Sequence, residues 1–280
     1  MISDVKNKNY TFRYIVATYI VFWLGILILG GLYLLLKNDI ILDLSLVVLS
    51  WTPTIVLLIM FNKLFPNTSR KEWIKKSFSS KINFGIVVIT CVAFILTVAC
   101  TYLILFFKRD DVLSIDFNLS TIGFIVLTII SSIITGATGE ELGWRGYLQG
   151  YYEENNNGII IKSALKVSLV WTFWHTPLWF MSAGGEIVFL VNYIATFIIE
   201  NFCLSIIIAI CYNRCKNIFI PMWIHFLSNF TMSLMAPYFS TNASIIEGKW
   251  WLTLFYLLIT TLFIIWHQNA IKRANTLINK

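Results

Sequence analysis

Two adjacent glutamates and an arginine stand at the end of a long uncharged stretch, in the segment TGEELGWRG. Ionisable side chains in or beside a membrane span are costly and usually line a functional cavity. On a continuous helix, Glu141 and Arg145 lie four residues apart on one face, in the favourable order for an ion pair. Glu140 points about 100° away and is left without that partner. We therefore expect Glu140 to be available for chemistry, whereas the alternative is that both glutamates only end the span at the membrane interface.

Two further polar motifs follow, each with a histidine at helical spacing. In WTFWH, Trp171 and His175 are four residues apart, and in HFLSN, His225 and Asn229 are four apart. Each pair shares a helix face, and alone each pair is also typical of hydrogen bonding between helices in a bilayer. Together with the glutamates, the motifs indicate a hydrolytic site. A carboxylate supplies a general base, and neutral N–H groups opposite it hold a developing oxyanion.

The order of these motifs resembles the CAAX prenyl protease and bacteriocin-processing (CPBP, Abi-type) family of intramembrane endopeptidases. The matching motifs are Glu140-Glu141-x-x-x-Arg145, Trp171-x-x-x-His175 and His225-x-x-x-Asn229. Each falls on a separate predicted helix, and together they cover about a third of the chain. The family usually has phenylalanine where this chain has Trp171, a departure that keeps the aromatic wall. Each motif is weak alone, but three in order are a specific signal.

The resemblance implies an eight-helix membrane peptidase whose cavity faces the cytoplasm. It also implies roles for the motif residues. Glu140 activates water with help from His175, and His225 and Asn229 form the oxyanion hole.

Glu141 and Arg145 hold the shape of the site in this scheme. Members of the family resemble glutamate proteases, so no cofactor is expected. The sequence lacks His-Glu-x-x-His, which removes the usual zinc-protease helix. A zinc ion held by Glu140, His175 and His225 is the alternative, because two histidines and a carboxylate can hold catalytic zinc.

The composition places these motifs in a membrane protein. The 280 residues are 58% hydrophobic and only 12% charged, and the mean hydropathy is +0.77, whereas globular domains are about a quarter charged. We expect an all-α, polytopic fold with about eight spans around a polar cavity, each of about 20 residues. The expected spans are 13–36, 40–61, 83–107, 119–138, 163–181, 187–211, 218–236 and 250–267. No linker or repeat divides the chain, so residues 1–280 are expected to form one domain with the motifs in 119–236.

The distribution of basic residues predicts the orientation. With the N-terminus inside, 17 of the 21 lysines and arginines fall on the cytoplasmic side and four outside. The positive-inside rule therefore predicts that both termini are cytoplasmic. The net charge of +7 is a membrane-orienting signal rather than a nucleic-acid patch. Usage rich in Ile, Asn and Lys suggests a low-GC bacterium and hence its cell membrane.

The expected partners are membrane lipids and a peptide or protein substrate entering from the membrane or the cytoplasmic face. A peptide precursor or membrane-associated peptide is favoured over a prenylated protein. Two other classes of function remain open. One is a non-catalytic bacteriocin-immunity or scaffold protein, and the other is a proton-coupled transporter that would also use Glu200, although no repeated halves are visible.

Overall fold

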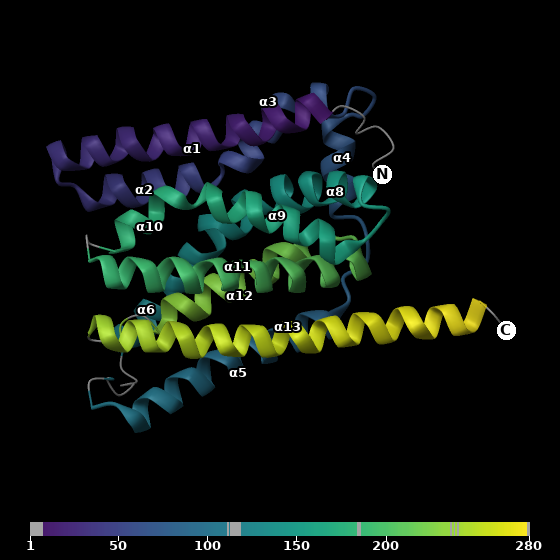
Figure 1. Cartoon of the computed structure of the whole chain (residues 1–280). Coiled ribbons are helices and arrows are strands. Elements are labelled where there is room, and N and C mark those ends of the chain that lie inside the picture. The colour runs from purple at the N-terminus through teal and green to yellow at the C-terminus, as the bar shows by residue number, and fades with distance from the viewer. Residues whose placement is uncertain are drawn as a thin grey trace.

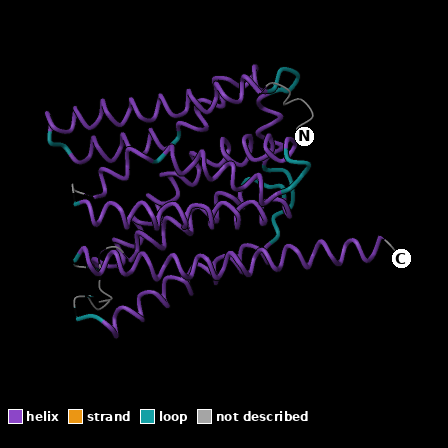
Figure 2. The backbone as a smooth tube through the Cα atoms, in the orientation of Figure 1, coloured by secondary structure: helices purple, strands orange, loops and turns teal. Residues whose placement is uncertain are grey.

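A computed structural model describes residues 8–110, 112, 119–183, 186–235, 237, 239 and 241–278. These residues are helical almost throughout, and in the described part of the chain a single bridge between Val112 and Phe239 is the only β-type pairing. Figure 2 shows the helices connected by short loops. The elements are α1 (Lys8–Leu36), α2 (Asp39–Ser50), α3 (Thr52–Leu64), α4 (Arg70–Ser77), α5 (Phe84–Lys108), α6 (Leu119–Ser132), η1 (Ile133–Ala137), α7 (Thr138–Glu141), η2 (Leu142–Gln149), α8 (Gly150–Asn155), α9 (Ile160–Trp174), α10 (Thr176–Ala183), α11 (Ile187–Cys215), α12 (Phe219–Met235) and α13 (Asn242–Ile278).

Several of these helices are long and apolar enough to cross a membrane, which confirms an all-helical membrane fold. Within the described residues there are five such helices, or six if α2 and α3, bent by 43°, count as one broken span. The expected count of eight spans is not confirmed. The expected span 163–181 is divided at His175 into α9 and α10, and the expected span 218–236 is α12, which has only 17 residues.

The basic segments gather at one end of the bundle. In Figure 1 the start of α1, the end of α13, α4 and α8 all lie at this end, on the right of the view. We call it the basic end. It carries most of the charges predicted to be cytoplasmic, although Lys6 and Lys280 lie outside the described residues. The turn between α1 and α2 and the start of α11 lie at the opposite end.

The centre of the bundle is α11, which packs against α9, α12 and α13. The fourth span packs closely on α3 because its second half carries small residues. A Cβ atom on Gly139 would lie 2.6 Å from the Trp51 ring, so only glycine permits this approach. Small residues at helix contacts are typical of membrane bundles. The close packing fixes α7, and with it the two glutamates, between α3 and α12.

Candidate active site

The fourth span is broken immediately before the glutamates. Thr135 and Gly136 have non-helical backbone angles, and φ is +87° at Gly136, a conformation that favours glycine. The helix then restarts as α7 and η2, of which η2 has the wider π-type turn often found at functional sites. The break therefore separates the apolar half of the span from the half that carries the polar motif.

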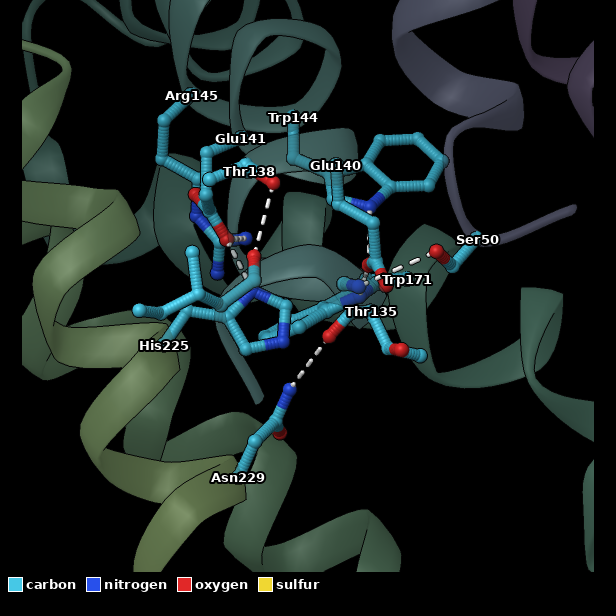
Figure 3. A network of polar contacts seen from close by, with 12 residues as sticks. Ser50, Thr135, Thr138, Glu140, Glu141, Trp144, Arg145, Trp171, His225 and Asn229 are labelled. Carbon is cyan, nitrogen blue, oxygen red and sulfur yellow. Dashed lines mark hydrogen bonds and ion pairs between the residues drawn. The ribbon is translucent and has the colours of Figure 1, made fainter. Parts of the chain in front are cut away.

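Other helices supply the hydrogen bonds that this break removes. The Trp51 indole N–H donates to the Ile134 carbonyl at 2.9 Å, and the Gly136 N–H donates to the Ser50 hydroxyl at 3.2 Å. The Asn229 amide donates to the carbonyl of residue 135 at 3.2 Å. Irregular backbone at membrane depth persists only where such partners satisfy it. The bend between α2 and α3 and the helix α12 thus hold the break from two sides (Figure 3).

Glu140 is almost fully buried, with 3% of its surface exposed. Its Oε2 atom accepts hydrogen bonds from two indole N–H groups, those of Trp144 at 3.0 Å and Trp171 at 2.5 Å. The two indoles fix the carboxylate and leave Oε1 free of these bonds. Glu140 is therefore held by tryptophans rather than by a cation.

The free oxygen of Glu140 converges with two nitrogens from α12. A Cβ atom built on Gly136 would lie 3.0 Å from Glu140 Oε1, 3.2 Å from His225 Nε2 and 3.2 Å from Asn229 Nδ2. These three atoms therefore surround one point, which is open because residue 136 has no side chain. An acceptor and two nitrogens around one point suit a reacting water or carbonyl oxygen.

Glu141 forms the predicted ion pair and also contacts the second histidine. Its Oε1 atom lies 3.0 Å from Arg145 Nη1 and 2.7 Å from His225 Nδ1. The guanidinium group also stacks over Trp171, with 4.3 Å between Cζ and the ring centroid. All three ionisable groups are buried. The Glu141–Arg145 pair thus connects the fourth span to α9 and α12.

His175 lies at the end of α9, one turn after Trp171. Its Nδ1 atom lies 2.8 Å from the Trp171 carbonyl oxygen, and since a carbonyl only accepts, Nδ1 carries the hydrogen. The Nε2 lone pair is then available. The ring packs edge-on against Trp174 and Phe197, and the side chain lines the same cavity as His225 and Asn229.

A cavity of about 390 Å³ opens beside these groups. Residues of α6, η1, α9, the first half of α11, α12 and α13 line it. The lining side chains include Trp171, Phe197, Tyr193, Ser131 and Met232. Its lining residues run from His225 to Ser233 along α12 and over the first half of α11, and the start of α11 lies at the end of the bundle opposite the basic end (Figure 1). That the cavity faces the cytoplasm stays a prediction from the resemblance.

The structure thus brings together the six residues predicted from the motifs. Sequence reasoning missed the two indole donors to Glu140 and the contacts of Ser50 and Trp51. The contact of Trp144 could have been predicted, because Trp144 stands four residues after Glu140 and shares its helix face.

Glu200 lies in the same cavity and is paired. Its carboxylate forms an ion pair with Lys249 and accepts a hydrogen bond from Thr253 at 2.9 Å. The pair joins α11 to α13 inside the bundle. Glu200 therefore connects two helices and is not a free ionisable group.

The zinc alternative requires Glu140, His175 and His225 to bind one metal ion. His175 and His225 each use Nδ1 for a hydrogen bond and keep Nε2 available. However, among the described residues, no group of three or more His, Cys, Asp or Glu side chains is close enough to hold a metal ion. As arranged here, Glu140, His175 and His225 do not fit one.

Fold and site together define a polytopic helical membrane protein with a polar cavity among its spans. Residues 121–231 match the family model described as type II CAAX prenyl endopeptidase Rce1-like. The chain is also 28% identical over 256 residues to CAAX prenyl protease 2 of Methanococcus maripaludis, covering 84% of this chain and 88% of that protein. Both matches confirm the resemblance drawn from the motifs and indicate a protease, that is, a peptide hydrolase.

Proposed function

We propose that the protein is an intramembrane endopeptidase in which Glu140 activates water. One observation carries the proposal. Glu140 Oε1, His225 Nε2 and Asn229 Nδ2 surround a single point beside the cavity, while two indoles hold the other carboxylate oxygen. A base and two nitrogens opposite it are the parts that peptide hydrolysis requires.

In the first step, Glu140 Oε1 takes a proton from water as the oxygen attacks the carbonyl carbon of the scissile bond. The electron pair of the carbonyl double bond moves to its oxygen. His225 and Asn229 donate hydrogen bonds to that oxyanion. Such donors are each worth about 10²–10³ in rate when they are aimed at the developing charge.

In the second step, protonated Glu140 gives its proton to the leaving nitrogen. The tetrahedral intermediate then collapses, the carbon–nitrogen bond breaks, and an acid and an amine are released. His175 assists the first step, because its Nε2 lone pair is suited to accept the second hydrogen of the water and orient it. Glu141 and Arg145 hold His225 in place.

The proposed substrate is a membrane-associated peptide or protein precursor. A cavity among membrane helices admits a segment from the bilayer, and its aromatic and polar lining suits a peptide. The named relative is a CAAX prenyl protease. For this chain we propose a peptide precursor in a bacterial cell membrane, with the basic end in the cytoplasm. Preferential cleavage of a prenyl-cysteine peptide would contradict the choice of substrate but not the mechanism.

The test is cleavage of a fluorogenic peptide library by purified protein in detergent. Wild type, Glu140→Gln and the control Glu72→Gln are compared with and without a strong chelator, with the metal content measured. We expect activity that survives the chelator and is lost only in Glu140→Gln. Activity removed by chelator and restored by zinc would replace the mechanism with a metal-dependent one. An intact wild type that cleaves nothing would favour a scaffold or a transporter.

A further inference from the structure

A line of polar residues runs from the site to the basic end of the bundle. Glu141, Arg145, Gln149 and Glu153 follow one another at four-residue spacing along α7, η2 and α8. At 1.5 Å per residue the line is about 18 Å long. We call these four residues the polar column. The proposed reaction uses only its first two members.

The two halves of the column are bonded internally. Arg145 pairs with Glu141 at the site, and the Gln149 amide donates to Glu153 at 2.8 Å near the basic end. Glu153 also accepts from Asn213 at 2.7 Å.

Exposure rises along the column from the site outward. The side chains of Glu141 and Arg145 are 0% exposed, and Gln149 is also fully buried. Glu153 is 14% exposed, and its partner Lys216 is 50% exposed. The column therefore reaches the surface at the basic end, away from the cavity.

The middle of the column contains buried polar atoms that no described group satisfies. They are Glu141 Oε2, Arg145 Nε, Arg145 Nη2 and Gln149 Oε1. Donors and acceptors are both present, so the set is complementary. The wider turn of η2 lies at this level.

Such a cluster has a usual physical solution. Buried polar groups are almost always hydrogen-bonded, and an unsatisfied one costs about 1–3 kcal/mol. Where several converge, ordered waters that make two to four hydrogen bonds normally satisfy them. We do not expect so many unsatisfied polar atoms to lie in one column by chance, next to a reacting carboxylate.

We propose that ordered waters bridge Arg145 to Gln149 and complete a hydrated path from the site to the basic end. The ligand of this new site is water itself. The inference rests on the proposed function for its purpose. Hydrolysis consumes one water for each bond cleaved, and a substrate that fills the cavity blocks the entry of water through it. The column supplies a second route for water, from the basic end of the bundle.

The first test does not depend on activity. An experimental structure of the full chain, at a resolution that shows water, is expected to place ordered water within hydrogen-bond distance of Arg145 Nη2 and Gln149 Oε1. A column closed by direct side-chain contacts, with no water peak, would overturn the proposal even if the protein proves to be a protease.

The second test uses kinetics. Gln149→Leu removes the polar middle, Gln149→Asn keeps an amide donor and acceptor, and Thr97→Val is a control at a buried hydroxyl that bonds only its own helix. We expect Gln149→Leu to lower kcat about tenfold with KM unchanged, and Gln149→Asn to keep most of the wild-type kcat. Equal kcat in Gln149→Leu and Thr97→Val, both folded, would count against a water path.

Discussion

The Nδ1 atom of His225 lies 2.7 Å from Glu141 Oε1, the same oxygen that Arg145 binds. Because Glu141 accepts both bonds, Nδ1 carries a hydrogen, and Nε2 then donates only if the ring is a cation. The sequence predicts two neutral donors in the oxyanion hole, and for His225 that proposed role requires Nε2 to carry a second hydrogen.

Glu141→Gln tests this arrangement. The substitution keeps the shape and removes the charge that holds His225 and Arg145. We expect kcat to fall about 100-fold, because a neutral amide holds the proposed oxyanion donor His225 less firmly than the carboxylate does. Leaving the Arg145 cation buried without its partner costs about 3–5 kcal/mol. Thermal unfolding and kcat of the purified variant measure the two effects. A stable variant with normal kcat would show that the Glu141 charge is not used.

Trp171→Phe tests the indole bond to Glu140. Phenylalanine keeps the aromatic wall but removes one of the two N–H groups that hold Oε2. Hydrogen bonds to charged groups contribute about 1.5–3 kcal/mol to stability, so we expect the variant to lose stability of that order and kcat to fall because the carboxylate is held less firmly. Trp174→Phe is the matched control, since the Trp174 N–H is buried without a described partner. The idea fails if both variants lose the same activity.

Gly136→Ala tests the point on which Glu140, His225 and Asn229 converge. The new Cβ atom would occupy that point, within 3.2 Å of all three polar atoms. It would also strain a backbone with φ of +87° by about 1–2 kcal/mol. We expect activity to fall at least 100-fold.

The matching control is Gly123→Ala, because nothing lies within 4 Å of the Cβ position there. Peptide cleavage and thermal unfolding are measured for both variants. Normal cleavage by Gly136→Ala would place the reacting water elsewhere.

Lys249→Met tests the ion pair of Glu200. It leaves the carboxylate buried without its cation, and breaking such a pair typically costs about 3–5 kcal/mol. The double variant Glu200→Gln/Lys249→Met removes both charges and is expected to recover most of that stability. Unfolding midpoints of the two variants decide the matter. If the double variant is no more stable than the single one, the pair is not the reason for the loss.

Local spacing predicted the parts of the site that lie on one helix. The Glu141–Arg145 pair follows directly from residues four apart on a helix. The contact between Glu141 and His225 joins residues 84 positions apart, and no periodicity shows which helix faces which. The break at Gly136 was also missed, because its partner Ser50 stands 86 positions earlier.

The span count differed for a physical reason. Hydropathy marks apolar length, and α12 is apolar yet only 17 residues long. α9 ends at Trp174 with His175 as its cap, and Pro177, which has no N–H to continue the helix, follows two residues later, so one expected span is divided in two. Polar residues of the site thus interrupt the signals from which spans are counted.

One short helix separates the cavity from the bilayer. Ser131 and Ser132 at the end of α6 line the cavity, while Leu127 and Ile130 of the same helix are exposed on the apolar surface. A substrate anchored in the same bilayer meets this helix by diffusing in two dimensions. Its effective concentration is then the number of substrate molecules per lipid molecule. Adding inert lipid at constant volume lowers this ratio and therefore slows the reaction. Molarity alone does not describe such an enzyme.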